Sequence, residues 1–186
     1  MNKFIFFLFA LASSFILMSA GTTTSTVISD ADILNASKHL YDLERVNYEP
    51  KYIAPVQAAL CAASAPSSSD LHAGKYINVY VNSTGFAEMT TKKKPVFPEG
   101  TMIMKEKMSA DSAKGYKPAE LFTVMIKREK GFNPTCGDWE FATLDVKTSK
   151  IERGKTATCM NCHIKYTATD FIKRDYLSLK YTKTLK

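Results

Sequence analysis

Two cysteines and a histidine form the run Cys159-Met160-Asn161-Cys162-His163 near the C-terminal end of the chain. A C-x-x-C-H run is the pattern at which c-type haem is attached to protein. Two thiols at this spacing can reach the two vinyl groups on one edge of a porphyrin, and the adjacent histidine can bind the iron through a ring nitrogen. The sequence therefore predicts one covalent haem c, held by Cys159 and Cys162, with His163 as the axial iron ligand.

Two other uses of these cysteines compete with haem attachment. A zinc site would need further ligands, and the only other histidines in the chain are His39 and His72. A redox-active dithiol of the thioredoxin kind stands early in a βαβ pattern, whereas this motif comes late in the chain. Haem attachment is the interpretation that fits the position of the motif.

The N-terminal segment has the composition of a secretory signal peptide. Lys3 supplies positive charge, residues 4–18 are largely apolar, and small residues lead into a polar stretch. The apolar run is short for a membrane span, although an uncleaved anchor is the alternative. We expect a periplasmic or secreted protein with a signal peptide at 1–20, an N-terminal helical segment at 21–70 packing on the domain, and a haem domain at 71–186.

The formal net charge of +7 is scattered along the chain. The basic residues fall in short groups such as Lys92–Lys94 and Lys173–Arg174, and none is interleaved with aromatic residues as a nucleic-acid surface would require. We therefore expect no nucleic acid partner. Solvated faces and a soluble, acidic redox partner both remain open.

The periodicity of the sequence predicts helices first and then strands. Ser29 or Asp30 can cap a helix that runs to Arg45, and a second short helix is expected at 55–63, before a loop at 65–69. Alternating patterns predict strands at 76–82, which ends in a turn at 83–85, and then at 101–107, 121–127 and 138–144. The expected fold is α+β, mainly an antiparallel sheet with N-terminal helices and a haem-bearing helix near the C-terminus, followed by a helical piece that starts near 169.

The position of the motif bears on the second axial ligand of the iron. No methionine follows His163, so a sixth ligand would have to come from upstream. Packing or surface roles are favoured for the available upstream methionines and histidines, namely Met89, Met102, Met104, Met108, Met125, His39 and His72. We expect a five-coordinate haem with an open distal face.

Cys61 and Cys136 remain once the haem has taken its two cysteines. In an oxidising compartment two such cysteines commonly form a disulfide, which would stabilise the fold by roughly 3–5 kcal/mol in the chain-entropy model. Two free thiols are the alternative.

Residues around the motif segments have two interpretations each. Trp139 is predicted to anchor the core of the sheet, whereas Asp138 or Glu140 could instead hold a lysine or a partner of a haem propionate in place. Arg153 and Lys155 shortly precede the motif and are either counter-ions of the propionates or simply solvated.

Three segments resemble one known family in order and spacing: Gly100–Glu106 (G-T-M-I-M-K-E), Gly137–Phe141 (G-D-W-E-F) and Cys159–His163. They are similar to the cytochrome P-460 family, which includes the related cytochromes c′-beta, over residues 74–178. The resemblance implies an antiparallel sheet with few helices, and a homodimer. It also implies that Lys105 is bonded to a meso carbon of the porphyrin; the alternative is a lysine exposed on a strand.

One position departs from the family pattern. Family members that oxidise hydroxylamine carry a distal carboxylate, and the matching residue here is Thr123, which can hydrogen-bond but cannot act as a base near neutral pH. Its neighbours Phe122, Val124 and Met125 predict a dry pocket suited to NO or CO. The resemblance thus leaves two functions, oxidation of hydroxylamine or NO at a Lys105-modified haem and non-enzymatic gas binding, with electron transfer less favoured.

Overall fold

The four predicted strands form the centre of one antiparallel sheet. A computed structural model describes residues 27–54, 74–109 and 119–185, and within them the sheet has seven strands in the order β1-β3-β4-β5-β6-β7, with β2 also paired to β3. The strands are β1 (Glu44–Arg45), β2 (Lys51–Ile53), β3 (Lys75–Val81), β4 (Met102–Met108), β5 (Leu121–Lys127), β6 (Trp139–Asp145) and β7 (Ile151–Gly154). The helices are α1 (Asp30–Lys38), α3 (Ser83–Thr91), α5 (Ala157–His163) and α6 (Leu179–Thr182), and the 3₁₀ turns are η1 (Leu40–Asp42), η2 (Pro134–Cys136) and η3 (Ile164–Thr169).

The predicted fold class and the central strands are confirmed. The strand predicted at 121–127 has the bounds of β5, and the other three predicted strands are displaced by one residue from β3, β4 and β6. Alternation of side chains along these strands explains the agreement, because it places every second residue on the same face of the sheet.

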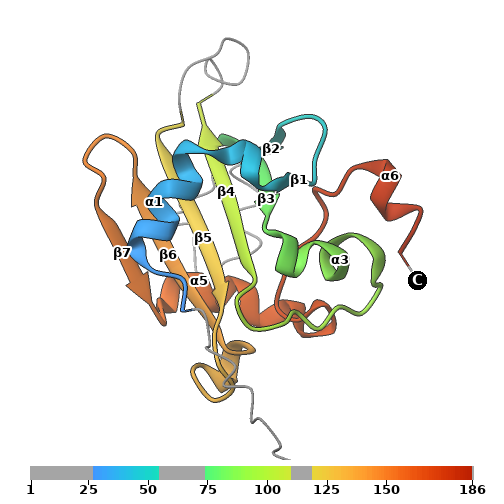
Figure 1. Cartoon of the computed structure of the whole chain (residues 1–186). Coiled ribbons are helices and arrows are strands. Elements are labelled where there is room, and N and C mark those ends of the chain that lie inside the picture. The colour runs from blue at the N-terminus through green and yellow to red at the C-terminus, as the bar shows by residue number, and fades with distance from the viewer. Residues whose placement is uncertain (1–26, 55–73, 110–118, 186) are drawn as a thin grey trace, which may run out of the picture.

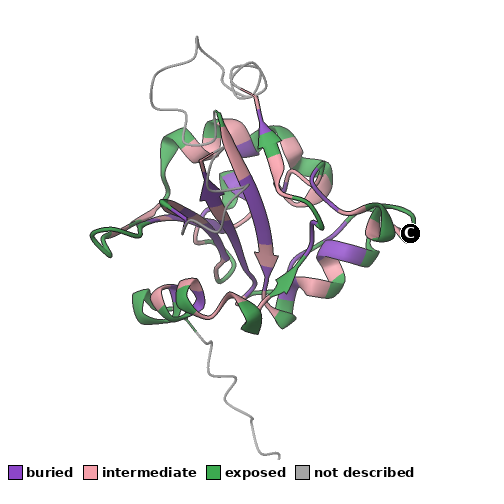
Figure 2. Ribbon diagram, turned by 90° about the horizontal axis from the view of Figure 1, so that it is seen from above, coloured by how far each residue is buried: buried purple, intermediate pink, exposed green. Residues whose placement is uncertain are grey.

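The sheet buries both of its faces, each in a separate apolar cluster. On the motif face, Val79, Ile103, Met125 and Phe141 pack together with the partly buried Cys159 of α5. On the α1 face, Met104, Val124 and Leu144 pack against Ile33 and Ala36 of α1. Figure 1 shows α1 across the front of the sheet and α5 behind it, and Figure 2 shows the buried residues concentrated along the central strands between the helices.

The first helix begins as predicted but is shorter. Ser29 caps α1, its hydroxyl accepts a hydrogen bond from the backbone N–H of Asp32, and the Asp32 carboxylate accepts from Ser29 in return. The helix ends at Lys38 rather than Arg45, since the chain turns through η1 and residues 44–45 pair with β3. Leu40 and Leu43 still pack on the α1-face cluster, which accounts for their helix-like spacing.

Two other local predictions are wrong. Residues 83–85, predicted as a turn, are the first turn of α3, which the side chain of Asn82 caps by accepting from the N–H of Gly85. A helical piece was expected to start near Thr169, but η3 ends there, Asp170 and Phe171 take positive φ values of 50° and 64°, and α6 begins at Leu179. Strands β1 and β2, within the segment expected to be helical, and strand β7 were not predicted.

Some predictions fall outside the described residues. These are the signal peptide at 1–20, the helix at 55–63 and the loop at 65–69. Among the helices of the described ranges, none combines the length and the apolar character that a membrane crossing needs.

Candidate haem site

Helix α5 carries the C-x-x-C-H motif, as the sequence predicts. Cys159 and Cys162 are one helical turn apart, which puts both thiols on the same side of the helix. Neither cysteine is in a disulfide and both are half-buried, whereas His163 at the end of the helix is buried. The helix therefore presents two thiols and one imidazole together, the donor set that attaches haem c.

A backbone carbonyl orients the imidazole of His163. Its Nδ1 lies 2.7 Å from the carbonyl oxygen of Phe171. A carbonyl can only accept, so Nδ1 carries the proton and donates it, and Nε2 keeps its lone pair. Burial, with a contribution from the charge of Lys105, lowers the pKa of His163 to about 3. The ring is therefore neutral at physiological pH, which is the form that binds a metal.

Lys105 lies on the motif face of β4 and is only 8 % exposed. The alternative of a lysine exposed on a strand is therefore wrong. Its charge acts on both His163 and Cys159, and its Nζ lies 5.5 Å from the centre of the Tyr176 ring. The sheet thus brings Lys105 to the helix that carries the haem motif, although the two are more than fifty residues apart in the sequence.

Thr123 is the cross-strand partner of Lys105. The two residues face each other in the β4–β5 register, a pairing that sets Cβ atoms about 4.5–5.5 Å apart. The hydroxyls of Thr123 and of Tyr176 are buried and have no hydrogen-bond partner in the structure. Buried polar atoms are normally satisfied, so two orphaned hydroxyls around Lys105 fit a site that takes a polar group. These hydroxyls, together with the two thiols and the imidazole of α5, fit a haem c.

The neighbours of Thr123 correct the predicted pocket. Phe122 and Val124 belong to the α1-face cluster, because successive side chains of a strand point to opposite faces. Of the three apolar residues expected around Thr123, only Met125 lies on the motif face. Of these three neighbours, the predicted apolar surroundings of Thr123 therefore keep only Met125.

The upstream methionines and histidines also divide between the two faces. Met102 and Met104 pack on the α1 face, and His39 ends α1, where its Nδ1 lies 3.1 Å from the carbonyl oxygen of Asn35. Met89 and Met125 belong to the motif-face cluster as packing residues. His72 lies outside the described residues.

Cys136 is a buried free thiol in η2. Burial raises its pKa to about 11. The structure therefore does not support the predicted disulfide with Cys61, a residue outside the described ranges.

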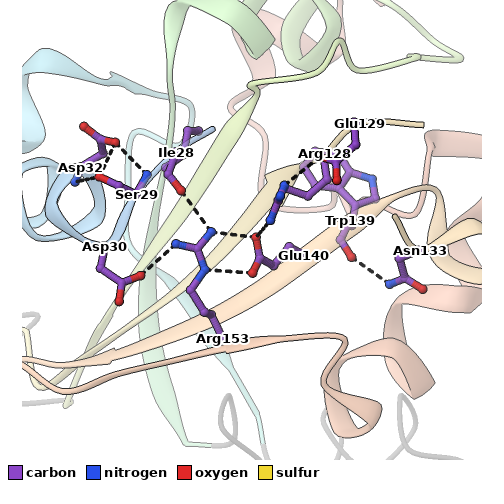
Figure 3. A network of polar contacts seen from close by, with 10 residues as sticks. All are labelled: Ile28, Ser29, Asp30, Asp32, Arg128, Glu129, Asn133, Trp139, Glu140 and Arg153. Atoms are coloured by element: carbon purple, nitrogen blue, oxygen red, sulfur yellow. Dashed lines mark hydrogen bonds and ion pairs between the residues drawn. The ribbon is translucent and has the colours of Figure 1, made fainter. Parts of the chain in front are cut away.

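Arg153, which shortly precedes the motif, forms ion pairs with residues on the opposite face of the sheet. Arg153 donates to Glu140 at 2.7 and 2.8 Å and to Asp30 at 2.8 Å, and Arg128 donates to the same Glu140 (Figure 3). This network ties the start of α1 to β6 and β7, so Arg153 is a structural residue and not a counter-ion on the motif face. Trp139 is fully buried in the core, which confirms its predicted role.

Sequence reasoning missed three residues that the structure brings to the site. The carbonyl of Phe171 contacts His163, Asp170 directly precedes it with the same left-handed backbone, and Tyr176 contacts Lys105 from the C-terminal segment. No periodicity marks these positions. The pair Thr169-Asp170 was instead predicted to lie at the start of a helical piece.

Comparison with known proteins agrees with this arrangement. A family model described as cytochrome P-460 matches residues 58–173, a range that includes β3 to β7 and the whole haem motif. No curated protein matches the chain.

Proposed function

Because this chain belongs to the cytochrome P-460 family of haem cytochromes, we propose that it is an exported, monohaem c-type protein that takes a small nitrogen species beside Lys105. Cys159 and Cys162 would hold the haem by thioether bonds, and Nε2 of His163 would bind its iron. The bound haem would supply a redox-active iron with a position for a small ligand.

The observation that carries this proposal is the buried pair of Lys105 and Thr123 on the motif face. Thr123 offers a hydroxyl that has no hydrogen-bond partner among the described residues. A hydroxyl can donate a hydrogen bond to a small ligand such as NO but does not take up a proton near neutral pH. Binding of NO, with CO as an analogue, is therefore the function that the site supports best.

Oxidation of hydroxylamine, or of NO, is the second candidate. The burial of Lys105 beside the motif helix favours it, since a lysine in this position can be joined to the porphyrin edge and so alter the electronics of the iron. Oxidation of hydroxylamine also needs a group that accepts protons. Among the described residues, Glu140 is the only acidic residue classed as buried, and two arginines hold it on the α1 face.

The test begins with protein made in a host that matures c-type cytochromes. An intact mass one haem above that of the processed polypeptide, and a c-type spectrum, are expected. The ferrous protein should then bind NO at one site per chain. Turnover of hydroxylamine with an artificial acceptor would instead favour the oxidase, and a colourless protein of unmodified mass would overturn both candidates.

Assembly and partners are part of the same proposal. We expect a homodimer and a soluble redox partner, and sedimentation of the haem-loaded protein tests the former. A monomer at micromolar concentration would contradict it.

A further inference from the structure

Two consecutive residues in an unusual conformation hold the carbonyl that orients His163. Asp170 and Phe171 have φ values of 50° and 64°. Side chains other than glycine rarely adopt this left-handed conformation, and a bulky phenylalanine is especially disfavoured there. Neighbouring contacts must therefore hold both residues in place.

Asp170 is fixed by three separate parts of the chain. Its carboxylate accepts two hydrogen bonds from Nζ of Lys127, at 2.7 and 2.8 Å, in an ion pair whose side chains are only 11–12 % exposed. It also accepts from the backbone N–H of Phe97 at 2.8 Å. The carbonyl oxygen of Asp170 accepts from Nε1 of Trp139, again at 2.8 Å. Asp170 is therefore hydrogen-bonded to strand β5, to strand β6 and to the loop before β4.

Phe171 is fixed on its other side by Gly137. A Cβ placed on Gly137 would lie 2.6 Å from Cε2 of Phe171, so only glycine lets the ring come this close. The backbone N–H of Phe171 donates to the carbonyl of Tyr166 at 2.8 Å. The contacts of Phe171 and those of the preceding Asp170 together fix the Phe171 carbonyl, whose oxygen lies 2.7 Å from Nδ1 of His163.

We propose that Asp170 is a positioning residue for the iron ligand, acting through the Phe171 carbonyl on His163. A hydrogen bond from Nδ1–H to a fixed acceptor sets the tautomer and ring orientation of the histidine and makes Nε2 a stronger donor to the metal. The Lys127–Asp170 pair is the part of this arrangement that a substitution can loosen. The effect on the iron rests on the proposed function, because it requires that His163 bind haem.

The first test compares Asp170→Asn with the matched control Glu140→Gln in the haem-loaded protein. Asparagine tolerates the left-handed conformation and can still accept from Phe97, but it loses the charge that holds Lys127. Glu140→Gln also removes one carboxylate from a buried ion pair, on the α1 face. We expect the iron–histidine stretch of the ferrous protein to fall and the reduction potential to rise in Asp170→Asn only. Wild-type values for both in Asp170→Asn would overturn the proposal.

A second pair of variants keeps the test decisive if Asp170→Asn does not fold. Gly137→Ala presses on Phe171, whereas Gly131→Ala imposes a similar left-handed strain, at φ 93°, with nothing within 4 Å. The iron–histidine stretch should shift in Gly137→Ala alone. Equal spectra in the two variants would count against the proposal.

A third measurement separates this inference from the proposed function. If the wild-type protein carries no haem, the ¹⁵N shifts of His163 in the haem-free chain still report its tautomer. The proton should sit on Nδ1 in the wild type and move in part to Nε2 in Asp170→Asn. An Nε2–H tautomer in the wild type would overturn the positioning role whether or not haem is bound.

Discussion

Lys105 and Thr123 face each other across β4 and β5, and both side chains enter the buried face that α5 covers. Taking a charged amine out of water costs free energy, so Lys105 is unusual among strand lysines. The positive charge of Lys105 acts electrostatically on both His163 and Cys159. The pair therefore defines where the chemistry of this protein is expected.

Replacing Lys105 by arginine should remove any bond to the porphyrin edge but leave the thioether bonds at Cys159 and Cys162. We expect a ferrous absorption band that moves to the position of an ordinary c-type haem, with an unchanged number of haems per chain. Lys107→Arg is the matched control, because Lys107 is buried on the same face of the same strand. Identical spectra in wild type and Lys105→Arg would show that no cross-link forms.

Replacing Thr123 by valine keeps the shape of the side chain and removes its hydroxyl. If that hydroxyl donates to bound NO, its loss should cost about 1 kcal/mol, which is roughly a fivefold faster dissociation of NO. Thr143→Val, one strand further from Lys105, is the control and should leave the rate unchanged. Stopped-flow measurement of NO release decides between these outcomes. Equal rates in the two variants would remove Thr123 from the ligand site.

Replacing Glu140 by alanine should lower the free energy of unfolding by about 3–5 kcal/mol, because Arg128 and Arg153 lose a partner that is only 6 % exposed. Glu129→Ala is the control, since Glu129 is half exposed and should contribute no more than about 1 kcal/mol. Urea unfolding measures both. A loss in Glu140→Ala as small as that in the control would contradict the prediction.

The same carboxylate predicts a dependence of stability on pH. Burial opposes its ionisation, but hydrogen bonds from Arg153 and Arg128 outweigh burial and lower the pKa of Glu140 below the usual 4.5. A depressed folded-state pKa gives stability that is present above pH 4.5 and is lost as pH falls through the lower value. Unfolding of Glu140→Gln should therefore depend less on pH than that of the wild type below this point. Parallel pH profiles would argue against the role of Glu140.

Labelling of thiols tests the state of Cys136. Burial and a pKa of about 11 should protect this thiol from alkylation in the native protein, while unfolding should expose it to reagent. Mass spectrometry before and after denaturation measures the change. If unfolded protein takes up label at Cys61 and Cys136 only after reduction, the two form the disulfide that the sequence suggested.

The sequence predicted what depends on local pattern. Alternation gave the central strands, the capping residue Ser29 gave the start of α1, and the cysteine spacing gave the haem helix. Assigning residues to faces required the register of the sheet as well. Phe122, Val124 and Met125 are neighbours in the sequence, yet only Met125 shares a face with Thr123.

Contacts over long distances in the sequence could not be predicted in this way. The contact of Lys127 with Asp170 joins a residue on β5 to one after η3, and Asp170 belongs to no repeating pattern. The left-handed backbone of Phe171 is even harder to predict from the sequence, because phenylalanine disfavours this conformation and only the surrounding contacts impose it.

Successive side chains of β4 alternate between the α1 face, where they support the fold, and the motif face, where the chemistry is expected. Even-numbered positions such as Met102 and Met104 support α1, whereas Ile103 and Lys105 face the motif helix. Alanine substitutions along this strand should therefore alter the visible spectrum at Ile103 and Lys105 and the melting temperature alone at Met102 and Met104. Natural or laboratory selection could then tune the reactivity of this protein and its robustness from the same seven residues of β4, with little conflict between the two.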